Sequence, residues 1–123
     1  MAKKFVDTSK LGLPKQIEHQ FREFCRGLQE VFAEGLKSIT VYGSLARHEY
    51  FPERPDINVL IVVHDADLET LRRTVDIVAK GREGCRVTPF FLTMHDIKTS
   101  TDVFPIKFYD MKDSYEVIYG EDI

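Results

Sequence analysis

The sequence predicts an α/β (α+β) domain in which helices flank a mixed β-sheet of about three to five strands. Two observations carry this prediction. Segments of helical periodicity alternate with short β-branched segments, and one of the latter, 57–63, is apolar on both faces. A strand of that kind belongs at the centre of a sheet that is covered on both sides. The length suits one unit, so residues 1–123 are expected to form a single domain.

An amphipathic helix over about 14–34 is the first expected element. Its apolar residues recur at spacings of three and four, which lines one face of a helix. They are Ile17, Phe21, Phe24, Leu28, Val31 and Phe32. Pro14 suits the first turn and Gly35 the C-terminal cap. The β-branched segment from Ser38 to Tyr42 then predicts a short strand that stops at Gly43.

The core of the domain is expected to span residues 36–92, with a second helix between two of its strands. Asp65 or Asp67 can cap this helix, which Gly81 is expected to end. Its apolar residues at helical spacing are Leu68, Leu71, Val75 and Val78. The segment 86–92 predicts a third strand, in which Pro89 favours an edge or a bulge because it cannot donate a ladder hydrogen bond.

The C-terminal segment, 93–123, is expected to mix helix and strand. Thr93 and Asp96 resemble a capping box for a short helix. Pro105 suits the first turn of another helix that reaches about Lys112, with Phe104, Phe108 and Met111 on one face. Phe104, Ile106 and Phe108 would equally share one face of a strand. The segment 115–119 predicts a final strand.

Charge and hydropathy narrow the classes of partner. The formal net charge of −3 argues against long nucleic acid, whose binding requires many cationic contacts, but it is compatible with a mononucleotide. No apolar run approaches the ~20 residues of a membrane span, and no signal peptide is apparent, which predicts a cytoplasmic protein without a membrane partner. Cys25 and Cys85 lack metal-ligand or disulfide-framework spacing, so buried free thiols are expected.

One stretch carries a chemical signal. Gly43 and Ser44 follow a strand, and after an interval of eleven residues Asp56-x-Asn58 stands at the head of the central strand. This order, covering Ser38 to Val63, resembles the nucleotidyltransferase superfamily with the polymerase-β-type fold. The resemblance implies a nucleoside triphosphate as ligand and two Mg²⁺ ions held by three carboxylates, two from an Asp-x-Asp motif and one on a later strand.

The residue types in this stretch suit phosphate and metal binding on physical grounds as well. Gly43 allows a tight turn, after which backbone N–H groups and the Ser44 hydroxyl can hold phosphate oxygens. Arg47 can pair with a phosphate, although a surface ion pair with Glu49 fits equally well. Asp56 and Asn58 lie two residues apart on a strand, so both side chains can reach one ion. Asp56 is therefore the expected catalytic and metal-binding carboxylate.

The expected metal site is incomplete. Asn58 replaces the second aspartate with a neutral amide, and 86–92 contains no acid. One carboxylate and one amide predict a single, weakly held Mg²⁺ that shares the nucleotide's phosphates as ligands. Glu49, Glu53 and Asp96 are other acids that can fill the gap, but no spacing recommends one of them.

Two functions follow as hypotheses. The first is a nucleotidyltransferase-like protein that binds a nucleoside triphosphate with Mg²⁺ and has weak or lost transfer activity. The alternative is a non-catalytic interaction module that pairs with a helical partner protein, antitoxin-like or regulatory, or with a second copy of the chain.

Overall fold

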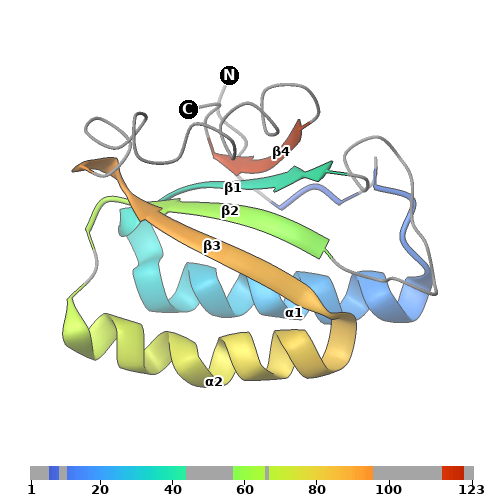
Figure 1. Ribbon diagram of the computed structural model, residues 1–123, viewed down its shortest axis with the longest axis horizontal. Coiled ribbons are helices and arrows are strands. Elements are labelled where there is room, and N and C mark those ends of the chain that lie inside the picture. Colours follow the sequence, from blue (N-terminus) through green and yellow to red (C-terminus); the bar gives the residue numbers. More distant parts are fainter. Residues whose placement is uncertain (1–5, 9–10, 44–56, 66, 96–114, 121–123) are drawn as a thin grey trace.

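The described residues of the chain form two long helices and a four-stranded mixed sheet, which confirms the predicted fold class. The computed structural model describes residues 6–8, 11–43, 57–65, 67–95 and 115–120. Its elements are α1 (Lys15–Phe32), the 3-10 turn η1 (Ala33–Gly35), β1 (Leu36–Tyr42), β2 (Ile57–Val63), α2 (Leu68–Cys85), β3 (Val87–Thr93) and β4 (Tyr115–Gly120). Both helices lie on the same side of the sheet (Figure 1).

The strand order is β3-β2-β1-β4, so β2 lies inside the sheet as its apolar sequence predicts. It pairs antiparallel with β1 and parallel with β3, while β1 pairs antiparallel with β4. β3 is an edge strand, which confirms the position that Pro89 favours. Because β3 is reached through α2, its parallel pairing with β2 is a β-α-β crossover.

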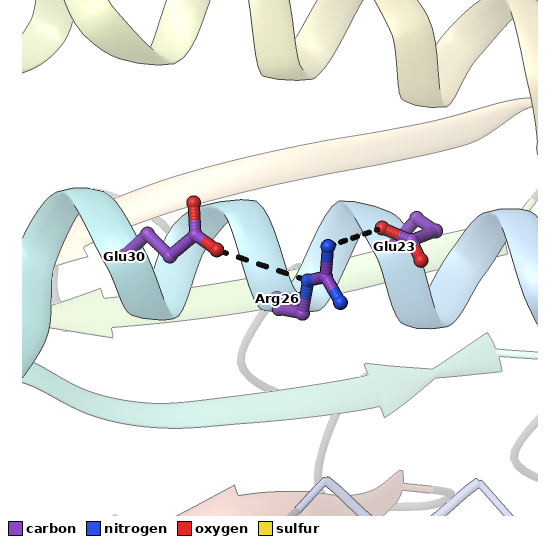
Figure 2. Close-up of polar contacts among 3 residues, drawn as sticks. All are labelled: Glu23, Arg26 and Glu30. Atoms are coloured by element: carbon purple, nitrogen blue, oxygen red, sulfur yellow. Dashed lines mark ion pairs between the residues drawn. The ribbon is translucent and has the colours of Figure 1, made fainter.

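The main core lies between the sheet and the two helices. β2 contributes every second residue to it, and α1 contributes the face that its periodicity predicts. Fully buried members include Phe21, Leu28, Ile39, Ile57, Val59 and Ile61. The opposite face of α1 carries charge: Arg26 lies 3.5 Å from Glu23 and 3.7 Å from Glu30 (Figure 2). These exposed ion pairs contribute little to stability, so burial of the apolar face holds α1 in place.

The end of α1 differs from the prediction. Gly35 is not its cap: the helix stops at Phe32, and Ala33 takes a left-handed φ of 49° instead. A single 3-10 turn then leads directly into β1, which starts at Leu36, two residues before the predicted Ser38. Gly35 has a different role, because its carbonyl accepts a hydrogen bond of 2.7 Å from the backbone of His64.

The end predicted for α2 at Gly81 is also wrong. The helix continues to Cys85, and Arg86 caps it in the left-handed conformation, φ 59°. Gly81 is buried, and a Cβ there would come within 2.7 Å of the Phe24 ring and 2.8 Å of Val87. This glycine therefore permits close packing of α2 on α1 and β3, and it does not terminate the helix.

The N-terminus of α2 matches one of the two predicted caps. Asp67 accepts a hydrogen bond of 2.7 Å from the backbone N–H of Thr70, and Asp65 does not act as the cap. That hydrogen bond holds the pKa of the Asp67 carboxyl below its usual value. The carboxylate is therefore charged at neutral pH, where it also faces the positive end of the helix dipole.

Three of the four apolar residues predicted for the inward face of α2 do not face the core. Leu68, Leu71 and Val75 are 71%, 41% and 63% exposed. The residues that α2 buries are instead Thr74, Gly81 and Cys85. The periodicity thus predicts the helix correctly, but the side that packs inward combines these small residues with Ile77 and with Val78, the one member of the predicted stripe that packs on the core.

Both cysteines are buried free thiols, as predicted. Burial raises the pKa of Cys25 far above its usual value and the pKa of Cys85 to about 11. Cys85 Sγ donates to the Gly81 carbonyl at 3.3 Å. These thiols belong to the core and carry no chemistry of the site.

The C-terminal predictions are met in part. β4 confirms the final strand, and β3 ends at Thr93, the predicted cap, after which the next two residues, Met94 and His95, are helical as expected. The helix expected from Pro105 to Lys112, and the capping partner Asp96, lie outside the described residues. Neither of the helices that the structure describes has the length and apolar content of a membrane span.

Candidate functional site

The predicted site residues Gly43 and Asn58 meet at one end of the sheet. β1 ends there and β2 begins, and Asn58 is the ladder partner of Tyr42, the residue before Gly43. On its other side Asn58 pairs with Thr88 of β3, and Tyr42 pairs with Tyr115 of β4. Ladder partners place their side chains on the same face. Four strands thus contribute one row across the sheet: Thr88, Asn58, Tyr42 and Tyr115.

This row lies on the face of the sheet that turns away from the helices. Leu60, Val62 and Leu92 follow it along the strands and form a second, smaller buried cluster with Tyr42. Asn58 is only half-buried and Thr88 is exposed. Asn58 and Thr88 are therefore accessible to solvent, unlike the apolar residues that follow them along the strands.

Gly43 approaches Asn58 closely because it has no side chain. Its φ is +81°, a conformation that L-residues rarely adopt. A Cβ built on Gly43 would lie 3.3 Å from Asn58 Nδ2. The backbone thus turns over the Asn58 amide as β1 ends, which is the approach that the sequence motif predicts for a glycine followed by a phosphate-binding loop.

The row contains no carboxylate. Thr88 is the β3 residue beside Asn58, so it occupies the place from which a neighbouring strand would supply a further metal ligand. A hydroxyl and an amide oxygen can both coordinate Mg²⁺ but bring no charge. Within the ranges that the structure describes, no three His, Cys, Asp or Glu side chains come together as a metal site. These residues alone do not fit a magnesium ion, whose charge would have to be balanced by Asp56 and by the ligand.

The backbone of a cationic residue, Arg86, is hydrogen-bonded to β2 at this end of the sheet. The carbonyl of Arg86 accepts a hydrogen bond of 3.2 Å from the backbone N–H of Ile57, the residue after Asp56. The Arg86 side chain is exposed. Its left-handed backbone therefore joins the end of α2 to the start of β2, and its exposed guanidinium is a group of the kind that binds anions.

The other predicted site residues, Ser44, Arg47 and Asp56, lie outside the described residues, as do Glu49, Glu53 and Asp96. Of the predicted set, the structure brings together Gly43 and Asn58. It adds Thr88 and Arg86, which the sequence motif does not single out because their positions follow from the parallel pairing of β3 with β2.

Comparisons with known proteins concern the fold. No protein-family model matches the sequence, and no curated protein matches it. A chain of the complex of tri-AMPylated Shewanella oneidensis HEPN toxin with MNT antitoxin is similar, with a TM-score of 0.51, 12% identity, and coverage of 85% of this chain and 73% of that chain. A chain of a toxin–antitoxin complex with AMP-PNP gives a TM-score of 0.52 at 13% identity, over 80% of this chain and 73% of that chain.

The chain therefore shares its fold with these chains, which agrees with the nucleotidyltransferase-type fold that the Gly-Ser and Asp-x-Asn stretch predicts.

Proposed function

We propose that the chain binds a nucleoside triphosphate at the sheet end where Gly43 meets Asn58, and that its nucleotidyl-transfer activity is weak or lost. The close approach of the Gly43 backbone to the Asn58 amide carries this proposal. It occurs in a fold shared with a complex that contains AMP-PNP. The left-handed glycine frees the backbone after β1 to face phosphate oxygens, as a triphosphate site requires.

Each residue of the proposed site has one task. Gly43, Ser44 and Arg47 bind the phosphates, and the exposed guanidinium of Arg86 adds a positive charge. Asp56 and the Asn58 amide oxygen orient the metal–nucleotide complex. If Mg²⁺ enters with the nucleotide, Asp56 and the Asn58 amide oxygen would hold it, and the ion would supply charge neutralisation.

The proposed weakness of transfer follows from charge. Asn58 and its neighbour Thr88 are both neutral, so Asp56 is left as the one carboxylate of the proposed site. A bound metal ion is worth several kcal/mol in the transition state, and about 1.4 kcal/mol corresponds to a factor of ten in rate. Loss of a second ion therefore lowers the rate about a hundredfold or more.

Calorimetry tests the proposal. Mg-ATP and Mg-GTP are titrated into the wild type and into Asp56→Ala, with circular dichroism to show that the variant is folded. We expect the wild type to bind at least one nucleotide and Asp56→Ala to bind it about tenfold more weakly. If neither nucleotide binds the wild type at millimolar concentration, the nucleotide site does not exist.

A second candidate function is a non-catalytic interaction module that pairs with a helical partner protein. It is favoured by one observation: both similar chains come from toxin–antitoxin complexes. Co-expression with the product of the adjacent gene distinguishes it. A complex that forms without nucleotide and survives Asp56→Ala supports the interaction module, whereas a complex that requires Mg-ATP supports the nucleotide site.

A further inference from the structure

Tyr115 stands at one end of the row of side chains that contains Asn58. Of the aromatic residues that the structure describes, only Tyr115 is exposed, at 40%. It begins β4 and is the ladder partner of Tyr42, so its side chain lies on the face of the sheet that turns away from the helices. An exposed aromatic ring thus lies one strand away from the place where β1 ends and Gly43 turns the backbone.

The chemistry of this end of the sheet changes from β3 to β4, the two outer strands of the described sheet (Figure 1). On the β3 side, Thr88 offers a hydroxyl, and Arg86, which directly precedes β3, adds an exposed cation. On the β4 side, Tyr115 offers an uncharged aromatic ring. A nucleoside triphosphate has the same polarity, because its phosphates are charged and its base is an aromatic ring. The two sides of the row therefore match the two ends of that ligand.

We propose that Tyr115 stacks on the base of the nucleotide and that the site selects purine nucleoside triphosphates. This inference rests on the proposed function, which places the phosphates at Gly43, beside Asn58. Tyr115 and Asn58 are the two ladder neighbours of Tyr42, one on either side of β1, so they lie roughly 10 Å apart across two strand spacings. A ribose separates the phosphates from the base, so a nucleotide held at Gly43 can reach the Tyr115 ring with its base.

Stacking on Tyr115 gives the site a preference among bases. Aromatic rings attract one another in offset, parallel arrangements, and every nucleic-acid base has a face that can take part. A purine has two fused rings and covers more of the phenol ring than the single ring of a pyrimidine does. The face of a tyrosine ring offers no hydrogen bond that distinguishes adenine from guanine. Stacking alone therefore favours ATP and GTP over CTP and UTP and does not distinguish the first two.

Calorimetry with two ligands separates this inference from the proposed function. Mg-ATP and Mg-tripolyphosphate, which has neither base nor ribose, are titrated into the wild type and into Tyr115→Ala and Tyr115→Phe. We expect Tyr115→Ala to bind Mg-ATP about tenfold more weakly and to bind tripolyphosphate as the wild type does. Tyr115→Phe keeps the ring and should retain the wild-type affinity for both ligands. Leu68→Ala is the matched control, because it removes an exposed apolar side chain at the start of α2, which follows the other end of β2.

Each contrary result identifies which proposal fails. A wild type that binds neither ligand overturns the proposed function and this inference together. A wild type that binds Mg-ATP no more tightly than Mg-CTP, or a Tyr115→Ala that binds Mg-ATP as the wild type does, overturns the stacking inference and leaves the phosphate site in place. A folded Tyr115→Ala that loses affinity for both ligands equally also overturns it, because the ring then acts on the phosphate site and not on the base.

Tyrosine fluorescence keeps the test decisive if Tyr115→Ala does not fold. The chain contains 5 tyrosines and no tryptophan, so tyrosine dominates its intrinsic fluorescence. A base stacked on Tyr115 quenches the emission of that ring. Mg-ATP should therefore quench the wild type, whereas Tyr115→Phe should bind Mg-ATP equally well and lose this quenching. Equal quenching of the two proteins places the base elsewhere and overturns the inference.

Discussion

Gly43 lies against the side-chain amide of Asn58, so that a Cβ on the glycine would approach Nδ2 to 3.3 Å. This contact joins the end of β1 to the start of β2 on the face opposite the helices. It links two separate parts of the Gly-Ser and Asp-x-Asn stretch, and it leaves no room for another residue at position 43 without movement of Asn58.

Gly43→Ala is therefore expected to have two effects. A left-handed alanine costs about 1–2 kcal/mol of stability, and the added Cβ displaces the Asn58 amide, which weakens nucleotide binding. Gly12→Ala is the matched control, because Gly12 also has a positive φ, +66°, but nothing lies within 4 Å of its added Cβ. Chemical denaturation should show a loss in both variants, and the Asn58 side-chain NMR signal should move only in Gly43→Ala. Equal movement in both variants would contradict the contact.

Gly81→Ala should destabilise the domain although alanine is the better helix former. Its Cβ would overlap Phe24 and Val87, which are buried, and overpacking of this kind costs about 1–3 kcal/mol. At Gly84 the obstacle is the end of the Gln20 side chain, which can move. Gly84→Ala should therefore leave stability unchanged or raise it by up to about 1 kcal/mol. Equal effects of the two substitutions in urea unfolding would disprove the close packing at Gly81.

Asp67 should make stability depend on pH. Its pKa is lowered in the folded state, so the stabilisation by its carboxylate is present above the ordinary value of 3.8 and is lost as pH falls through the folded pKa. Asp67→Ala should unfold more readily than the wild type at neutral pH, with a difference that shrinks below that value. Asp67→Asn retains an uncharged cap and should lose less stability at neutral pH. A difference that stays constant from pH 7 to acid would exclude the carboxylate as the cause.

Arg86→Gly should stabilise the fold and at the same time weaken nucleotide binding. Glycine adopts the left-handed φ of this position without strain, so the free energy of unfolding should rise by up to about 1 kcal/mol. Loss of the guanidinium should at the same time weaken binding of Mg-ATP severalfold. Arg86→Lys keeps the charge and the strain, and it should change both quantities little. Unchanged nucleotide affinity in a stable Arg86→Gly would remove Arg86 from the proposed site.

Much of the fold is predictable because local patterns determine it. The run 57–63, which is apolar on both faces, indicates the inner strand, and Pro89 indicates the edge strand. Asp67 is a residue type that commonly caps helices, and it stands directly before α2. The ends of the helices are less predictable. Gly35 and Gly81 are of the residue type that commonly ends a helix, but neither caps a helix in this structure. Gly81 is needed where α2 approaches Phe24, a contact that joins distant parts of the chain.

The sequence predicts only those site residues that lie within one continuous stretch of the chain. Gly43 and Asn58 are found from one continuous stretch, whereas Thr88 enters through the parallel register of β3 against β2. No local pattern specifies that register. The exposure of Leu68, Leu71 and Val75 has a similar reason: periodicity locates a ridge on α2 but does not say which side of the helix meets the core.

The central claim is that this end of the sheet is a nucleotide site limited by its missing carboxylates. It is tested by restoring negative charge at Asn58 and Thr88, which lie side by side on β2 and β3. Calorimetry in the presence of AMP-PNP measures the Mg²⁺ affinity of the wild type and of the double variant Asn58→Asp, Thr88→Asp. The control is Gln16→Glu, which adds one negative charge on the exposed surface of α1. The account predicts that the double variant binds Mg²⁺ about tenfold or more tightly and that Gln16→Glu behaves as the wild type. A folded double variant with unchanged Mg²⁺ affinity would contradict it.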